Sequence, residues 1–395
     1  MSAYLDHAAT TPMLPEAVEA MTEELGRVGN ASSLHTSGRR ARRVVEEARE
    51  TIAAAVGAGP SEVIFTSGGT EADNLAVKGL FWARQAGRPR RRIIVSSVEH
   101  HAVIDPVEWL AKEAGADVHW IGVDELGRLR LRELEAALAE DPDGVALVSV
   151  MWANNEVGTV QPIAEVVAAA HRHGVPVHTD AVQALGQLPL DFAASGADCL
   201  TVSAHKIGGP IGAGALIARR GLELVPVQHG GGQERGVRSG TMDAPAVRAF
   251  SVAARLAAER RPESALRLAA LRDGAVAAVL AAVPDAVLCG DPDPAGRLPG
   301  NAHFTFPGCE GDSLLYLLDA RGVECSTGSA CQAGVPQPSH VLVAMGVGPG
   351  VARGALRFSF GHSSRSADVD ALAAAIGPAV TRARRAGLAA PGSVR

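Results

Sequence analysis

The chain of 395 residues is 47% hydrophobic and 20% charged, and its formal net charge is −6. This composition excludes a disordered chain, and the length exceeds one ordinary hydrophobic core, so we expect two domains. The negative charge gives no electrostatic reason to expect nucleic acid or an anionic membrane as a partner.

Residues 60–220 alternate short, β-rich apolar runs with amphipathic stretches. Such alternation predicts a mostly parallel sheet with helices on both faces. The expected strands are Val63–Thr66, Ile93–Ser97, Val118–Ile121, Val145–Val150, Val175–Thr179, Cys199–Ser203 and Ala213–Ala218. The expected helices are Thr70–Gln85, His101–Ala114, Leu131–Ala139 and Ile163–His173.

The C-terminal part has a different pattern. An Ala-, Leu- and Arg-rich segment at 245–283 predicts a long helix, broken near Pro262, that joins two domains. Two short strands and two helices are expected after it, at Asn301–Phe306, Leu356–Phe360, Asp312–Ala320 and Asp368–Arg384. We therefore expect a large α/β domain at residues 15–255 and a smaller α+β domain made of residues 1–14 and 256–395.

Two features bear on the compartment. The first residues, Met1–His7, lack the basic and apolar regions of a secretory signal. The five cysteines include no CxxC pair, so neither a disulfide framework nor a zinc knuckle is expected. We therefore expect a protein of the reducing cytoplasm.

Polar residues gather where the expected strands end, which is the edge at which parallel sheets bind ligands. Thr66-Ser67-Gly68-Gly69-Thr70 lies between a strand and a helix. Its glycines would let a ligand approach the backbone, and a helix N-terminus suits a phosphate. A plain helix cap is an equally good interpretation, and no Gly-Lys-Ser/Thr follows, so this is not a Walker loop.

Lys206 and Asp180 are the most informative pair. Lys206 is one of only three lysines among 37 basic residues, and it follows the strand Cys199–Ser203. A lysine amine, unlike a guanidinium, can lose its proton and form a Schiff base. Asp180 closes a neighbouring apolar run, where it could cap a helix or keep a pyridine nitrogen protonated. Together they predict a site for pyridoxal phosphate (PLP).

Four further residues have chemistry that ordinary structural roles also explain. His100 could stack on a flat ring or be a plain loop residue, and Asn155 could simply form a turn. Arg357, in an apolar strand pattern, is either salt-bridged or grips a carboxylate. Cys331, in a segment of small residues, is either a nucleophile or an incidental surface thiol. No spacing of histidines predicts a metal site.

Taken jointly, these segments resemble the NifS/IscS-type cysteine desulfurases of the class V aminotransferase family. The resemblance covers nearly the whole chain, and its motifs are specific in combination. The matching stretches are Tyr4–Thr11, Thr66–Asn74, Glu99-His100, Asn154–Gly158, Asp180–Gln183, Ser203–Lys206, Gly236–Thr241, Ser326–Cys331 with Pro338–Leu342, and Arg357–Gly361.

The resemblance implies a fold-type I PLP-dependent transferase, with a mostly parallel seven-stranded sheet in its large domain and a homodimeric assembly. Lys206 would hold pyridoxal 5′-phosphate covalently, Asp180 would contact the ring nitrogen and His100 would stack on the ring. The other implied cofactor contacts are Asn155 and Gln183 to the ring oxygen, Gly69, Thr70, Ser203 and His205 to the phosphate, and Thr241 from a second subunit. Arg357 and Asn155 would bind the substrate carboxylate.

The implied reaction converts L-cysteine to L-alanine and leaves the sulfur as a persulfide on Cys331, in a mobile catalytic loop at about residues 325–337. The persulfide would pass to an acceptor protein, for iron–sulfur cluster assembly or for thiolation of transfer RNA or another target. No stable metal site is implied, although Cys331 could be a transient iron–sulfur ligand. Neither nucleic acid nor a membrane is implied as a direct partner.

Two enzyme alternatives keep the coenzyme: a class V aminotransferase and a selenocysteine lyase. A third alternative is a scaffold or iron–sulfur carrier that uses Cys331 with Cys325, but their separation is not a recognisable cluster spacing. The sequence departs from the family pattern twice. His101 stands where a lysine is common, and Gly208 stands where a bulkier residue is common.

Overall fold

A seven-stranded sheet forms the centre of the molecule in the computed structural model, which describes residues 2–328 and 338–389. In spatial order its strands are β2 (Val63–Thr66), β8 (Gly214–Ala218), β7 (Cys199–Ser203), β6 (Val177–Asp180), β5 (Val145–Ser149), β3 (Arg92–Ser96) and β4 (Asp117–Ile121). All neighbouring pairs are parallel except those of β8, which runs antiparallel to β2 and β7. The mostly parallel sheet expected from the sequence is confirmed.

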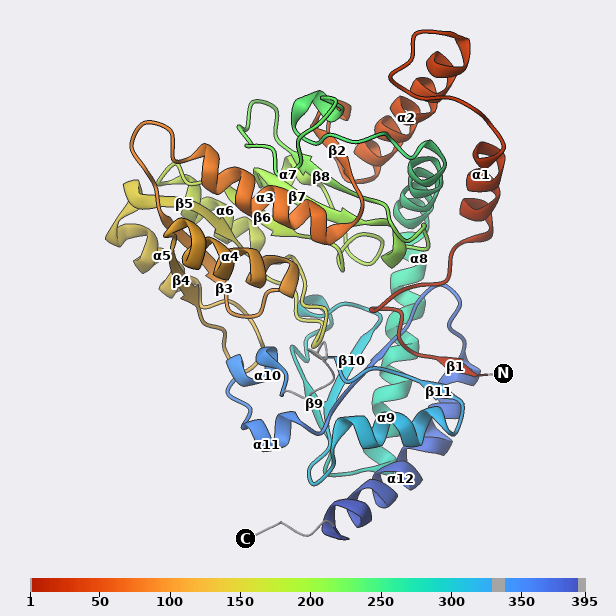
Figure 1. Ribbon diagram of the computed structural model, residues 1–395. Coiled ribbons are helices and arrows are strands. Elements are labelled where there is room, and N and C mark those ends of the chain that lie inside the picture. The colour runs from red at the N-terminus through yellow and green to blue at the C-terminus, as the bar shows by residue number, and fades with distance from the viewer. Residues whose placement is uncertain (1, 329–337, 390–395) are drawn as a thin grey trace.

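Helices cover both faces of this sheet (Figure 1). They are α1 (Pro15–Leu25), α2 (Thr36–Ala55), α3 (Gly69–Ala83), α4 (His101–Ala114), α5 (Leu131–Glu140), α6 (Ile163–His171), α7 (Phe192–Ser195) and α8 (Ala244–Ala282). Successive strand residues point to opposite faces, so Ile64 packs in the core under α3 and α4, whereas Phe65 packs with α2, α5, α6 and α8. None of the described helices has the length and apolar character needed to cross a membrane.

The C-terminal part adds two small sheets. β10 (Asn301–Thr305) pairs antiparallel with β9 (Val287–Cys289) and β12 (Ala355–Ser359), while β1 (Ala3–Tyr4) pairs parallel with β11 (Val323–Glu324). The helices are α9 (Gly311–Asp319), α10 (His340–Ala344), α11 (Pro349–Ala352) and α12 (Ser366–Ala389). Figure 1 shows β1 among these C-terminal elements, so the N-terminal segment crosses from the smaller part to the larger one.

The helix α8 joins the two parts, and the break expected near Pro262 is wrong, because the helix is continuous through it. A proline removes one backbone hydrogen bond and crowds the preceding turn. Here residues before it pack with α1 and α2, and residues after it pack with α12, which holds the helix together on both sides. The domain boundaries at 14/15 and 255/256 stay a prediction.

The end of β6 places Asp180. The strand expected at Val175–Thr179 begins later, at Val177, because Pro176 has no N–H to give to a central ladder. It also extends to Asp180, which makes that carboxylate the last residue of a central strand. Asp180 therefore lies at the C-terminal edge of the sheet, beside the end of β7.

Candidate active site

The C-terminal ends of the parallel strands border one open cavity, whose empty space including its mouth is about 1160 Å³. Ten residues that the sequence singled out line this cavity together, although they come from segments far apart in the chain. They are Gly69, Thr70, His100, Asn155, Asp180, Gln183, Ser203, His205, Lys206 and Arg357. Thr241 does not line the cavity of its own chain and is exposed.

Lys206 ends a short 3₁₀ turn, Ala204–Lys206, directly after β7. Its Nζ donates hydrogen bonds to the carbonyl oxygens of Ala8 (2.6 Å) and Ala9 (2.7 Å). Burial, and after it the positive charge of Arg357, lower the pKa of the amine to about 8. About a tenth of Lys206 is therefore uncharged at pH 7, and this neutral amine is the state that can attack an aldehyde.

Asp180 is 6% exposed, and among the described residues it accepts one hydrogen bond, from the backbone N–H of Val182 to Oδ1 (2.9 Å). Burial, and after it the negative charge of the neighbouring Asp73, raise the pKa of this carboxyl to about 7. A cation placed against Asp180 would favour the ionised form and offset that cost. The protonated nitrogen of a pyridine ring fits this requirement.

A second group of residues that line the cavity suits an anion. Helix α3 begins at Gly69, and a Cβ there would lie 3.0 Å from Val182 Cγ2, so the glycine keeps space open at the helix N-terminus. The buried Ser203 Oγ has no hydrogen-bond partner among the described residues. His205 stands beside it and shares a hydrogen bond with Thr10 (3.2 Å). An unsatisfied hydroxyl and free helix N–H groups fit a phosphate.

His100 and Gln183 also line the cavity. His100 is the N-cap of α4, where its Nδ1 accepts from the backbone N–H of Ala102 (3.1 Å). The residue is partly open to solvent, yet burial of its ring by the surrounding protein, and after it the positive charge of Lys206, lower the pKa to about 4. The imidazole is therefore neutral at physiological pH. Gln183 Nε2 donates to the carbonyl of Ala8 (3.0 Å).

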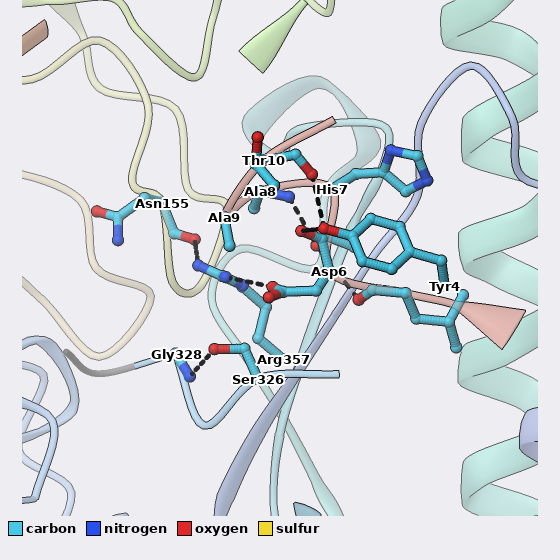
Figure 2. A network of polar contacts seen from close by, with 12 residues as sticks. Tyr4, Asp6, His7, Ala8, Ala9, Thr10, Asn155, Ser326, Gly328 and Arg357 are labelled. Carbon is cyan, nitrogen blue, oxygen red and sulfur yellow. Dashed lines mark hydrogen bonds and ion pairs between the residues drawn. The ribbon is translucent and has the colours of Figure 1, made fainter. Parts of the chain in front are cut away.

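Arg357 brings a buried guanidinium from β12 to the cavity, and Figure 2 shows it between Asn155 and Asp6. It donates to the Asn155 carbonyl (2.8 Å) and pairs with Asp6 Oδ1 (2.8 Å). Its Nε is buried and has no partner among the described residues. The salt bridge that the sequence offered as an alternative role is thus present, and the Nε–H remains without a partner among the described residues.

The comparisons with known proteins agree with this geometry. The aminotransferase class-V family model matches residues 3–372. The chain is 59% identical to the IscS-like cysteine desulfurase of Mycobacterium tuberculosis (strain ATCC 25618 / H37Rv) over 394 residues, which is 100% of both chains. The chain belongs to the class-V aminotransferase family, among its IscS-like and NifS-like cysteine desulfurases.

Solved structures of this family show the same fold. A NifS-like protein superposes with a TM-score of 0.89 at 34% identity, covering 97% of this chain and 100% of its own. A structure described as SspA in complex with cysteine has a TM-score of 0.78 at 33% identity, covering 91% of this chain and 99% of its own. Family membership and fold therefore rest on sequence and structure independently.

The N-terminal segment completes the site in a way that sequence reasoning missed. Tyr4–Thr11 was recognised only as a stretch that matches the family, without a chemical role. In the structure, the carbonyls of Ala8 and Ala9 receive Lys206, and Asp6 pairs with Arg357. Backbone carbonyls leave no mark in a sequence, so only the family motif could have pointed to this segment.

A second missed feature is a pair of buried acids near Asp180, of which Asp73 also lines the cavity. Burial raises the pKa of Asp73 to about 7 and that of Glu99 well above its usual value. Glu99 accepts from the Met151 N–H through Oε1 (2.7 Å), while its Oε2 has no partner among the described residues. Both acids lie inside motifs that were noted, but a carboxylate on a helix or loop gives no sign of burial in the sequence.

The two departures from the family pattern have local explanations. His101 lines the cavity and contacts Asp105 Oδ1 (3.0 Å), with its ring edge-on to His340. Gly208 has φ of +80°, and a Cβ there would lie 2.7 Å from Leu14 Cγ. Glycine is therefore the residue that this turn accommodates without strain.

The candidate nucleophile Cys331 lies outside the described residues. Ser326 and Gly328, just before the undescribed stretch 329–337, line the cavity. Among the described cysteines, Cys199, Cys289 and Cys309 are buried. Burial raises the pKa of Cys325 to about 12, which leaves its thiol protonated and a poor nucleophile.

Proposed function

We propose that this chain is a PLP-dependent cysteine desulfurase, which converts L-cysteine to L-alanine and transfers the sulfur as a Cys331 persulfide to an acceptor. The observation that supports the proposal most is the cavity, where a lysine of lowered pKa and a buried acid lie together at the strand ends. Family membership places the chain among enzymes that use this coenzyme.

Each end of the coenzyme has a matching part of the cavity. Lys206 would hold its aldehyde carbon, Asp180 its ring nitrogen, and His100 the face of its ring. Gln183 and Asn155 would contact the ring oxygen, and the helix N-terminus at Gly69 and Thr70 with Ser203 and His205 would take the phosphate. When bound, PLP supplies an electron-withdrawing ring that stabilises negative charge at the substrate's α-carbon.

The protein's own groups would then do the remaining work. Arg357 and Asn155 orient the substrate through its carboxylate. Lys206, in its neutral form, takes the proton from the α-carbon. The Cys331 thiolate attacks the substrate's sulfur, so that a sulfur–sulfur bond forms as the carbon–sulfur bond breaks. The electron pair of the broken bond stays with the substrate, whose β-carbon gains a proton and becomes the methyl group of alanine.

Two variants test this function and its alternatives. Cys331→Ser protein should keep an absorption band at about 420 nm, as imine chemistry predicts. The same variant should lose sulfur transfer from cysteine to an added thiol. An aminotransferase would keep turning over in this variant, and equal rates with selenocysteine and cysteine would favour a lyase of broader range. Lys206→Ala protein should lose the borohydride-reducible band, and wild-type sulfide release from that variant would refute the proposal.

Assembly and partners are part of the same proposal. Thr241 is exposed and absent from its own cavity, which fits a contact to the phosphate in a second subunit. We expect a homodimer, and a fully active monomer in analytical ultracentrifugation would contradict this. The sulfur acceptor would be a protein of iron–sulfur assembly or thiolation, found by trapping it as a mixed disulfide on Cys331. The cytoplasmic location stays a prediction.

A further inference from the structure

The loop 228–241 has a strained backbone. Among the described residues, Glu234 (φ +43°) and Arg235 (φ +58°) are the only ones other than glycine with a positive φ. A side chain makes this left-handed conformation costly, so it persists only where the surrounding contacts impose it, and such residues gather at functional sites. The loop ends at Thr241, which is exposed.

A buried ion pair holds the strained residues. The Glu234 carboxylate, on a residue 7% exposed, accepts from Arg49 Nη2 through Oε1 (2.6 Å) and from Arg49 Nη1 through Oε2 (2.7 Å). Its Oε2 also accepts from the backbone N–H of Phe65 (2.8 Å). Arg49 comes from α2 and is 5% exposed. A buried ion pair needs good geometry and further hydrogen bonds to offset its desolvation, and this pair has both.

The same contacts close the outer edge of β2. This strand is the first in the order of the sheet, so one of its edges has no neighbouring strand. Besides the N–H of Phe65, the carbonyl of Val63 is paired by side chains, accepting from Arg49 Nη1 (2.8 Å) and from Arg235 Nη2 (3.1 Å). Because β2 leads directly to Gly69 at the start of α3, the loop is fixed to the strand that delivers the proposed phosphate site.

A second carboxylate joins the loop to the same region. Glu71, in the first turn of α3, accepts from the backbone N–H of Ser67 (2.7 Å) and pairs with Arg238 of the loop (2.7 and 3.2 Å). Within the loop, the Gly240 N–H donates to Gln233 Oε1 (2.9 Å), which ties together the residues on either side of Arg238. Two carboxylates, one on the loop and one on α3, therefore bind the loop to the segment between β2 and α3.

We propose that Glu234 and Arg49 are positioning residues for the phosphate of the coenzyme. Their ion pair holds the loop 228–241 against β2, so that Gly69 and Thr70 serve the phosphate of their own subunit while Thr241 is presented to that of a second subunit. This role rests on the proposed function, which supplies the phosphate site and the role of Thr241. Arg49 acts from a distance, because α2 contributes none of the described residues that line the cavity.

Binding of pyridoxal 5′-phosphate and of pyridoxal to the full-length protein, freed of coenzyme, tests this role, because only the first ligand carries a phosphate. The two dissociation constants are read from the absorbance of the imine. Glu234→Gln keeps an acceptor for the Phe65 N–H but loses the charge that pairs with Arg49. It should weaken the binding of pyridoxal 5′-phosphate about tenfold, the usual scale for a lost charge-assisted contact, and leave that of pyridoxal within about twofold.

Glu46→Gln is the matched control. Glu46 pairs with the Nε of the same arginine (3.1 Å), but its side chain is 51% exposed, and among the described residues it makes no hydrogen bond to β2 or to the loop. Both substitutions remove a carboxylate from Arg49, and only Glu234→Gln releases the loop. Glu46→Gln should therefore leave both dissociation constants within about twofold of wild type. Equal effects of the two variants would overturn the assigned role of Glu234.

A double variant separates positioning from folding. Arg49 left buried without Glu234 destabilises the protein, so thermal unfolding of the coenzyme-free proteins checks that they are folded. Arg49→Met combined with Glu234→Gln removes both buried charges and should show the same loss of preference for the phosphorylated ligand. An unchanged preference in these variants, or an equal weakening of both ligands, would overturn the proposal. If the wild type formed no imine with either ligand, the proposed function itself would fail.

Discussion

Replacing Arg357 by lysine tests whether its guanidinium holds the substrate's carboxylate. Arg357 is 4% exposed and fixed by two contacts at 2.8 Å, to the Asn155 carbonyl and to Asp6 Oδ1. Its Nε has no partner among the described residues and remains available. Lysine would keep the positive charge but lose the planar fork that allows one side to hold the protein while the other holds a ligand.

The size of the effect follows from the contact that is lost. A hydrogen bond to a charged group contributes about 1.5–3 kcal/mol, and about 1.4 kcal/mol corresponds to a tenfold change in binding. We therefore expect kcat/KM for L-cysteine to fall about 10- to 150-fold in Arg357→Lys. Most of the fall should appear in KM, because the carboxylate contact is the same in the ground state and in the transition state.

The assay is alanine formation against cysteine concentration, with coenzyme loading checked by absorbance. Asp6→Asn is the matched control, because it removes the ion pair and keeps the guanidinium, so its KM should stay close to that of the wild type. A wild-type KM in Arg357→Lys would refute the reasoning. An equal rise of KM in both variants would show that the ion pair, and not the substrate contact, determines affinity.

Three further predictions concern buried groups. Burial raises the pKa of Asp73 to about 7, so the unfolded chain loses this proton at lower pH than the folded protein, and wild-type stability falls as pH rises from about 4 to about 7. In thermal unfolding of the coenzyme-free proteins, the stability of Asp73→Asn relative to wild type should therefore rise across this range, by up to about 4 kcal/mol. A difference in stability that does not depend on pH would contradict this. Gly208→Ala should lower the free energy of unfolding by about 1–3 kcal/mol, because of the left-handed φ and the clash with Leu14. Adding Leu14→Ala to this variant should recover only the part of the loss that comes from the clash. Cys325 should resist iodoacetamide at pH 8 in the native protein, as read by peptide mass spectrometry, and rapid labelling would show that its thiol is not buried.

The fold could be predicted because the strands of this sheet are buried on both faces. Such strands appear in the sequence as continuous apolar runs, as in Val145–Ser149, where every residue is buried. Since ligands bind at the C-terminal ends of parallel strands, the polar residues after these runs, including Asp180 and Lys206, could be assigned to one site before any contact was known. The cavity contains both.

Features set by tertiary contacts alone could not be predicted. Pro262 favoured a break in a helix that packing on either side keeps continuous. The contact of Lys206 with Ala8 joins residues almost two hundred positions apart through a backbone oxygen, which has no signature in the sequence. The expected role of Thr241 depends on a second subunit. The fold of a single chain shows only that this residue is exposed.

The electrostatics of the cavity explain why the pKa values of so many of its groups are shifted in the direction that favours the neutral form. Burial favours the neutral form of every group, so it lowers the pKa of Lys206, His100 and His205 and raises that of Asp180. A ligand with a cationic ring nitrogen and an anionic phosphate would reverse part of this, stabilising the Asp180 carboxylate at one end and a protonated His205 at the other. The protein therefore keeps its own charges low in the cavity where the proposed coenzyme would bring charges of its own, and the lowered pKa of Lys206 is a consequence of the same burial.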